Sequence, residues 1–221
     1  MSEVKTTALL ALAWLRQSKR LEGYACIGDF HGGLYECDHV SPYTKSGPNV
    51  DAKIMVIGQD WASADALAAS PPDLESAQLG YSPGLPTNRN LDDLLARHFD
   101  VDRSDCYLTN LFPFLKPGGM SAGIRRKDLV HCAKTFTLEE IRIVAPRIVI
   151  CLGLETFLAL RTAAGIKGSL KMAEAIASPF RFGNSSVHCV AHTGALGTNN
   201  RGRDQVEHDW KNLRKVLDTS R

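Results

Sequence analysis

The chain has 221 residues, 44% of them hydrophobic and 23% charged, a length that suits one well-buried globular domain and is short for two. We therefore expect a single domain over residues 1–221. The formal net charge of +2 neither requires nor excludes a polyanionic partner, because such binding depends on where the basic residues lie.

The first predicted element is an N-terminal helix from about residue 3 to 19, whose leucines cover a core face. Its apolar part, TTALLALAWL, spans ten residues and runs into RQSKR with no small-residue cleavage site near its end, so we expect no signal peptide. No segment approaches the length of a bilayer-spanning run, and we expect no membrane partner.

The cysteines show no close-paired spacing, and several fall in apolar runs. There are six of them: Cys26, Cys37, Cys106, Cys132, Cys151 and Cys189. This pattern favours reduced thiols in a cytoplasmic protein over a disulfide scaffold. An alternative is a zinc site made by Cys26, His31, Cys37 and His39, although their spacing lacks the tight ligand pairs of such sites. The other interpretation is loop residues and small core thiols.

Four short apolar runs rich in β-branched residues are the predicted strands: 53–58, 106–112, 147–153 and 187–192. They are continuous rather than alternating, as in strands covered on both faces. Helical patterns lie between and after them, at 90–98, 125–145, 154–165 and about 203–217. Strand alternating with helix predicts a three-layer α/β/α fold with a central four-stranded parallel sheet.

Polar side chains stand where these predicted strands end. Gln59 and Asp60 end the first strand, Asn110 ends the second, Gly153 the third and His192 the fourth. In a parallel sheet, ligands bind beyond the carboxyl ends of the strands. An acid, an amide and an imidazole would therefore converge on one edge, which predicts a site for a small polar ligand.

Each of these polar residues also has a purely structural interpretation. Asp60 suits the N-cap of a helix beginning near Ser63, and Asn110 suits a turn. His192 suits a loop, and Tyr81 suits a surface groove. Taken singly, the residues leave these alternatives open.

Four segments resemble, in the same order, the motifs of uracil-DNA glycosylases. DAKIMVIGQD (51–60) resembles the strand that runs into Gly-Gln-Asp, and LGYSPGLPTNRNLDDLL (79–95) resembles the aromatic-Ser loop with its Pro-rich turn. YLTNLFPF (107–114) is similar to the strand with the uracil-reading Asn, and VAHTGALG (190–197) to the closing His-Pro-Ser-Pro-Leu-Ser motif. The resemblance extends from residue 51 to about 215 and implies the fold of that family.

The resemblance implies roles for the strand-end residues. Asp60 would stabilise the developing sugar cation and orient water, as carboxylates do in other glycosidic hydrolysis. His192, with the backbone N–H of Gln59, would donate to O2 of the leaving uracil anion. Asn110 would pair with O4 and N3 of uracil and mismatch cytosine.

It also implies that the target base leaves the duplex. Tyr81 would stack on the base, and Leu196 would enter the vacated space. Phosphate contacts are expected from backbone and polar groups near the following residues: Ser82, Gly84, Gly194, Gly197, and Arg201 or Arg203.

The chain departs from the family after Asp60, where Trp61 and Ala62 replace a Pro and a Tyr that shuts out thymine. Trp61 or another group then rejects thymine, or bases with larger C5 groups are accepted. In the last motif, Thr193-Gly194-Ala195 replaces Pro-Ser-Pro, which changes the contacts that pinch the DNA.

Another branch of the family carries a four-cysteine iron–sulfur cluster. Here Cys132 stands at one ligand position, whereas Phe114 occupies another and no N-terminal Cys pair is present. We therefore expect no cluster, no metal and no other cofactor.

We predict a monofunctional uracil-DNA glycosylase of base excision repair, a cytoplasmic monomer that acts on uracil-containing DNA and leaves an abasic site. No lysine stands as a Schiff-base nucleophile, so strand cleavage is not expected. Two alternatives remain: a protein that binds uracil-containing or damaged DNA with little turnover, and a nucleoside or nucleotide hydrolase. Asp60 favours the enzyme over the binding protein, because a binding protein needs no water-activating carboxylate.

Overall fold

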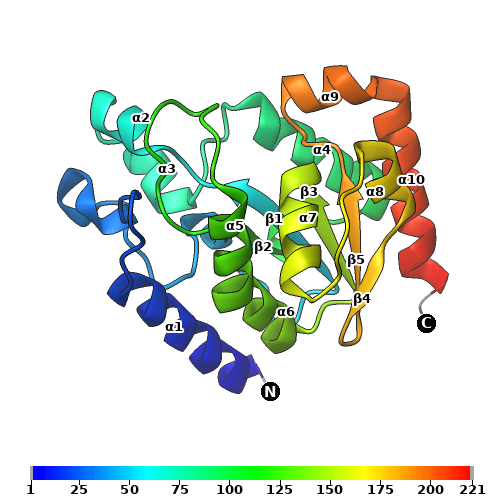
Figure 1. The fold of residues 1–221 in the computed structure, drawn as a ribbon, viewed down its shortest axis with the longest axis horizontal. Helices are drawn as coiled ribbons and strands as arrows, with labels where there is room; N and C mark the ends of the chain where they lie inside the picture. The colour runs from blue at the N-terminus through cyan, green and yellow to red at the C-terminus, as the bar shows by residue number, and fades with distance from the viewer. Residues whose placement is uncertain (1, 220–221) are drawn as a thin grey trace.

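The computed structural model describes residues 2–219 and has helices on both faces of a central sheet (Figure 1). The strands are β1 Ile54–Asp60, β2 Tyr107–Phe112, β3 Ile148–Leu152, β4 Phe180–Phe182 and β5 Ser185–Val190. The α-helices are α1 Ser2–Ser18, α2 Ala64–Ala69, α3 Leu74–Leu79, α4 Pro86–Phe99, α5 Arg126–Cys132, α6 Leu138–Val144, α7 Leu154–Ala163, α8 Met172–Ala177, α9 Ala195–Arg201 and α10 Arg203–Thr219. Short 3-10 turns lie at Ile27–Asp29, His31–Gly33, Pro42–Ser46 and Arg103–Asp105, and a π-helical turn, Ala133–Thr137, joins α5 to α6.

The sheet formed within residues 2–219 has five strands in the order β2-β1-β3-β5-β4. The four predicted strands are present and parallel, but the predicted strand number is wrong. β4 is a fifth strand at the edge, antiparallel to β5. Its three residues, Phe-Arg-Phe, are too few to stand out as an apolar run, and only the neighbouring strand makes them extended.

Successive residues of each strand face opposite layers of the core, which confirms the three-layer α/β/α prediction. Met55 and Ile57 of β1 pack in one cluster with α1, α5, α6, α7 and α8. Ile54 and Val56 pack in a second cluster with α4 and α10. Both faces of the sheet are therefore apolar, which explains why the strands read as continuous hydrophobic runs.

The segment between α1 and β1, to which the sequence assigned no role, is anchored to the exit of β2. The backbones of Ala25 and Leu115 exchange hydrogen bonds of 3.0 and 2.9 Å. The rings of Tyr24 and Phe112 meet edge to face with centroids 4.8 Å apart. This segment therefore fixes the chain that follows the second strand.

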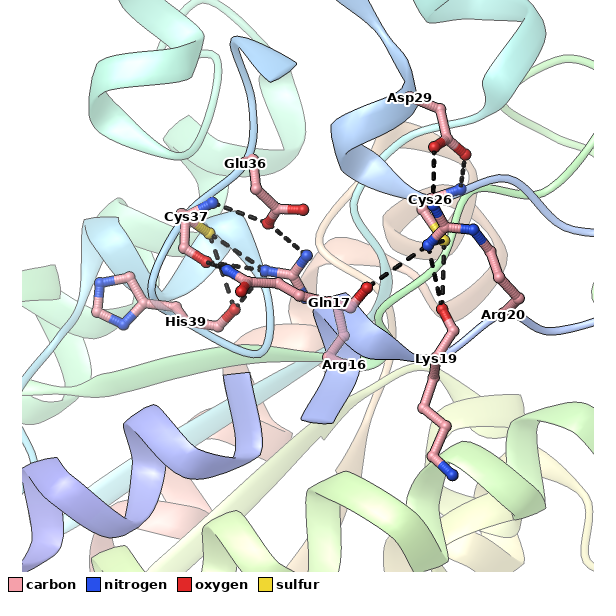
Figure 2. A network of polar contacts seen from close by, with 9 residues as sticks. All are labelled: Arg16, Gln17, Lys19, Arg20, Cys26, Asp29, Glu36, Cys37 and His39. Atoms are coloured by element: carbon pink, nitrogen blue, oxygen red, sulfur yellow. Dashed lines mark hydrogen bonds and ion pairs between the residues drawn. The ribbon is translucent and has the colours of Figure 1, made fainter. Parts of the chain in front are cut away.

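The cysteines of this segment contact arginines rather than a cluster of metal ligands (Figure 2). Arg16 donates to the carbonyl oxygens of Cys37 and His39 at 2.9 and 2.8 Å, while Arg20 contacts the Cys26 thiol at 2.9 Å. In the described part of the chain, no three His, Cys, Asp or Glu side chains gather as a metal site. The zinc interpretation has no support from this arrangement.

No helix within residues 2–219 combines the length and apolar character that crossing a bilayer requires.

A carboxylic acid is fully buried between α6 and β2. Glu140 Oε1 accepts hydrogen bonds of 2.9 Å from the hydroxyls of Tyr107 and Thr109. Its Oε2 atom has no hydrogen-bond partner among the described residues. Burial raises the pKa of Glu140 to about 8, although the two hydrogen bonds act in the opposite direction.

We expect Glu140→Gln to remove a decrease in the free energy of unfolding that the wild type shows as the pH rises. Because the pKa of Glu140 is higher in the folded chain than in the unfolded chain, its contribution to stability is full below pH 4.5 and is lost as the pH rises toward 8. Urea unfolding at pH 5 and pH 8 is expected to show this loss, about 2 to 5 kcal/mol, in the wild type but not in Glu140→Gln. Glu139→Gln, at a partly exposed neighbour, is the control. Parallel pH profiles for wild type and Glu140→Gln would contradict the assignment.

Candidate active site

A cavity of about 520 Å³ opens at the carboxyl edge of the sheet, where the sequence predicts the site. Its volume lies in the range of small-ligand pockets. The predicted residues that line it are Gln59, Asp60, Trp61, Ala62, Tyr81, Ser82, Asn110 and His192. The structure therefore brings together the acid, the amide, the imidazole and the aromatic ring.

Asn110 lies within β2, so its interpretation as a turn residue is wrong. It is the register partner of Gly58 on β1, and a Cβ atom at Gly58 would stand 2.6 Å from Asn110 Nδ2. Glycine at position 58 thus makes room for the amide over the neighbouring strand. Ser41 Oγ donates to Asn110 Oδ1 at 2.6 Å and accepts from the backbone N–H of Tyr43 at 3.2 Å, which fixes the hydroxyl that orients the amide.

Asp60 ends β1 and does not cap a helix. The N-cap of α2 is Ser63, whose hydroxyl accepts from the backbone N–H of Ala66 at 3.3 Å, so the capping interpretation of Asp60 is wrong. Asp60 Oδ1 accepts from Gln59 Nε2 at 3.1 Å, and Asp60 Oδ2 pairs with Lys116 Nζ at 2.7 Å. Both carboxylate oxygens are therefore held at the cavity wall.

Sequence reasoning missed Lys116. It lies on the loop after β2, and its residue is only 3% exposed. The only signal is a lysine at the end of the otherwise apolar run LFPFL, a position at which a buried charge needs a partner. Nothing in the sequence identifies that partner as Asp60.

His192 follows β5 and presents one defined ring nitrogen to the cavity. Its Nδ1 accepts from the backbone N–H of Gly194 at 3.0 Å, so the proton of the neutral imidazole is on Nε2. Although His192 is exposed at the residue level, desolvation by the neighbouring protein lowers the pKa of its imidazole, while the charge of Asp60 acts in the opposite direction. The site therefore holds a neutral N–H donor beside a carboxylate.

Two predicted glycines are explained by close packing around His192. A Cβ atom at Gly197 would stand 2.2 Å from the carbonyl oxygen of His192, and one at Gly194 would lie 3.0 Å from its Nδ1. The loop is also tied to the start of α4, because Thr193 Oγ1 donates to the Thr87 carbonyl at 2.9 Å. The first turn of α9 thereby fixes the imidazole.

The Tyr81 ring lines the cavity with a guanidinium stacked over it. Arg103 Cζ lies 4.2 Å from the ring centroid, within cation–π range. The guanidinium is held by an ion pair with Asp92 and a 2.9 Å hydrogen bond to the Asn88 carbonyl. Sequence reasoning missed Arg103, whose partners lie on other elements.

Trp61 and Ala62 form one side of the cavity. The Trp61 Nε1–H donates to the Gly80 carbonyl at 2.8 Å, and its ring centroid lies 5.2 Å from that of Tyr35. Ala62 is buried and packs in a small cluster with Tyr35 and Leu115. Tyr35 and Leu67 line the cavity beyond Ala62, so the small alanine leaves this side open.

The remaining predicted residues, apart from Ser82, are absent from the lining of the cavity. Leu196 is 76% exposed on α9, as a residue that enters a DNA stack must be. Arg201 makes a two-point ion pair with Asp209 at 2.8 and 2.9 Å, whereas Arg203 is exposed at the start of α10. Ser82 Oγ lies 2.6 Å from Ser76 Oγ, and Gly84 is exposed. The phosphate-binding roles of these residues stay predictions.

The family model of the uracil DNA glycosylase superfamily matches residues 44–214. The chain belongs to this superfamily. Its class of activity is therefore that of a DNA glycosylase, a hydrolase of DNA repair, and its partner is DNA. No curated protein matches the chain.

The cavity lies at the edge of the sheet, and most of its lining residues fall within the part of the chain that the family model matches. Four residues of the cavity, Asp60, Tyr81, Asn110 and His192, come from the four matching motifs. This DNA glycosylase adds Lys116 to them, beside the acid.

Proposed function

We propose that this DNA glycosylase removes uracil from DNA by hydrolysing the N-glycosidic bond, leaving an abasic site and an uncut strand. The observation that carries the proposal is the shared cavity, where a carboxylate, an amide and a neutral imidazole meet one aromatic ring. This set matches the demands of the reaction, which develops positive charge on the sugar and negative charge on the base.

Asp60 serves the sugar side of the reaction. Its carboxylate stabilises the oxocarbenium-like transition state and orients the attacking water. Gln59 and Lys116 hold its two oxygens, so little reorganisation is needed when the charge develops.

His192 serves the base side of the reaction. Because Nδ1 accepts from the Gly194 N–H, the Nε2–H is free of that bond and donates to O2 of the departing uracil anion. Removing one such preorganised donor typically costs about 2.7 to 4 kcal/mol of transition-state stabilisation. The backbone N–H of Gln59 is a second donor.

Asn110 selects the base. Its Nδ2 donates to uracil O4, and its Oδ1 accepts from uracil N3–H. Ser41 donates to that same Oδ1, which holds the amide in this orientation. Cytosine carries a donor at position 4 and an acceptor at N3, so both contacts would be mismatched.

The base reaches the cavity by leaving the DNA stack. Tyr81 stacks on the extruded uracil, and Leu196 fills the space left behind. Ser82, Gly84, Gly194, Gly197 and Arg203 contact the phosphates around it. We propose a monomer that works in base excision repair in the cytoplasm, where its six buried thiols stay reduced.

The test is incubation of the protein with a labelled single-stranded oligonucleotide carrying one deoxyuridine, followed by hot alkali. Alkali-dependent cleavage at that position is expected, with no cleavage before alkali. Intact DNA after long incubation at high protein concentration would contradict the proposal, and a retarded band in a gel shift would then indicate a binding protein.

Ala62→Tyr is expected to close the side of the cavity next to C5 of the base. Family members with Tyr at this position exclude thymine, whereas Ala62 leaves the space toward Tyr35 and Leu67 open. We expect the variant to slow release of 5-hydroxymethyluracil at least about 10-fold more than release of uracil, because only the substituted base meets the new ring. Equal losses on both substrates would contradict the steric explanation.

A further inference from the structure

A buried lysine without an assigned role pairs with the proposed catalytic carboxylate. Lys116 Nζ lies 2.7 Å from Asp60 Oδ2, and the two side chains are 4% and 9% exposed. At this distance and burial the pair is a charge-assisted hydrogen bond shielded from water, unlike the exposed ion pairs of the surface.

The backbone holds Lys116 at this place from both sides. Its carbonyl accepts from the Ala64 N–H at 2.8 Å, just after the strand that carries Asp60. The preceding residue, Leu115, is paired with Ala25 of the segment between α1 and β1. These contacts fix the backbone of Lys116, so that its side chain starts from a defined position beside the carboxylate.

Lys116 contacts Asp60 and is absent from the lining of the cavity. A nucleotide in the cavity would contact the carboxylate and not the ammonium. This placement distinguishes Lys116 from a nucleophile that attacks the sugar.

We propose that Lys116 is a positioning residue that acts through Asp60, an inference that rests on the proposed glycosylase reaction. Its ammonium holds Oδ2 while Gln59 holds Oδ1, so the carboxylate keeps one orientation toward the sugar. A buried carboxylate without a partner carries a large desolvation cost, and the lysine offsets this cost. The carboxylate then faces the sugar in a cavity from which the base has displaced water.

Lys116 also limits the effect of Asp60 on His192. The Asp60 charge favours a protonated imidazole, and a cation at 2.7 Å from that carboxylate opposes this effect. Keeping His192 neutral leaves Nδ1 able to accept from Gly194, which fixes the Nε2–H donor. The lysine thus influences both the Asp60 carboxylate and the His192 imidazole.

The test compares Lys116→Met and Lys116→Gln with Lys5→Met. Lys5 pairs with Asp51 at 2.8 Å, before β1 and away from the cavity, so it controls for the loss of a Lys–Asp pair. Under single-turnover conditions we expect the Lys116 variants to release uracil about 10- to 100-fold more slowly with nearly unchanged DNA affinity. Lys5→Met is expected to stay within about two-fold of the wild type.

A double-variant cycle separates positioning from a direct role. If Lys116 acts only through Asp60, Asp60→Asn/Lys116→Met is expected to be no slower than Asp60→Asn alone. Fully additive losses would overturn the proposal. So would a borohydride-trapped complex with DNA that forms with the wild type and is lost in Lys116→Gln, because the amine would then be a nucleophile.

The NMR titration of His192 tests the inference independently of turnover. We expect the pKa of His192 to rise in Lys116→Gln and to stay unchanged in Lys5→Met. No rise in a folded Lys116→Gln variant, or wild-type rates in it, would overturn the positioning role. If the wild type fails to release uracil, the proposed function is wrong, and the titration still decides whether Lys116 controls the site.

Discussion

Asp60→Asn is expected to slow uracil release by about 1000-fold or more. The amide keeps the shape of the carboxylate but supplies no negative charge to the developing sugar cation and no base for the water. DNA affinity is expected to change little, because Asp60 contributes to the transition state rather than to the phosphate contacts. Single-turnover release from an oligonucleotide with one deoxyuridine, together with a gel shift, measures both quantities.

The matched control is Asp51→Asn, which breaks the Lys5–Asp51 pair far from the cavity. This control shows how much of the change in rate comes from losing a Lys–Asp pair and how much from losing the Asp60 carboxylate in the reaction. Asp60→Asn also leaves the buried Lys116 without its ionic partner, so thermal unfolding of the variant must be checked beside its rate. Release within a few-fold of the wild type in a folded Asp60→Asn protein would remove Asp60 from the mechanism.

The sequence was sufficient to predict the layers of the fold and the polar residues at the strand ends. Continuous apolar runs identify strands buried on both faces, and polar residues in or just after the last part of each run lie near the carboxyl edge of a parallel sheet. Gln59, Asp60, Asn110 and His192 were predicted to converge for this reason, and they do line one cavity. Local pattern alone left capping and turn alternatives open for Asp60 and Asn110, and the structure removes both.

The missed residues share one physical property: their partners are distant in the sequence. Ser41 meets Asn110 across 69 positions, and Lys116 meets Asp60 from another strand's exit loop. Arg103 stacks on Tyr81 only because a turn before β2 lies beside the start of α4. Such contacts depend on tertiary packing, which periodicity and motif spacing do not encode.

The edge strand β4 was missed for a related reason. Phe180–Phe182 has three residues, of which only the first is buried, so it carries neither a long apolar run nor a clear alternation. Pairing with β5 supplies the hydrogen bonds that make it a strand. The part of the fold that forms the site did not depend on it, because the cavity lies at the ends of the parallel strands.

Asn110→Asp is expected to lower uracil release by about 1000-fold or more and to change which base is preferred. The new carboxylate has no N–H to donate to uracil O4, and two acceptors would then face each other in a site that excludes water. Cytosine presents an amino group at the same position, so we expect the ratio of cytosine to uracil release to rise. Paired oligonucleotides that differ only in that base measure the ratio.

Ser41→Ala tests the orientation of the same amide without altering Asn110. Loss of the 2.6 Å hydrogen bond to Oδ1 frees the side chain to turn its oxygen toward the position 4 substituent of the base. We expect discrimination between uracil and cytosine to fall by about 10-fold. The reason is that a single hydrogen bond, worth about 1 kcal/mol, favours the correct orientation of the amide. A Ser41→Ala enzyme that keeps full discrimination would show that Gly58 and the strand backbone alone orient Asn110. An Asn110→Asp enzyme that keeps its uracil rate would show that the amide does not select the base.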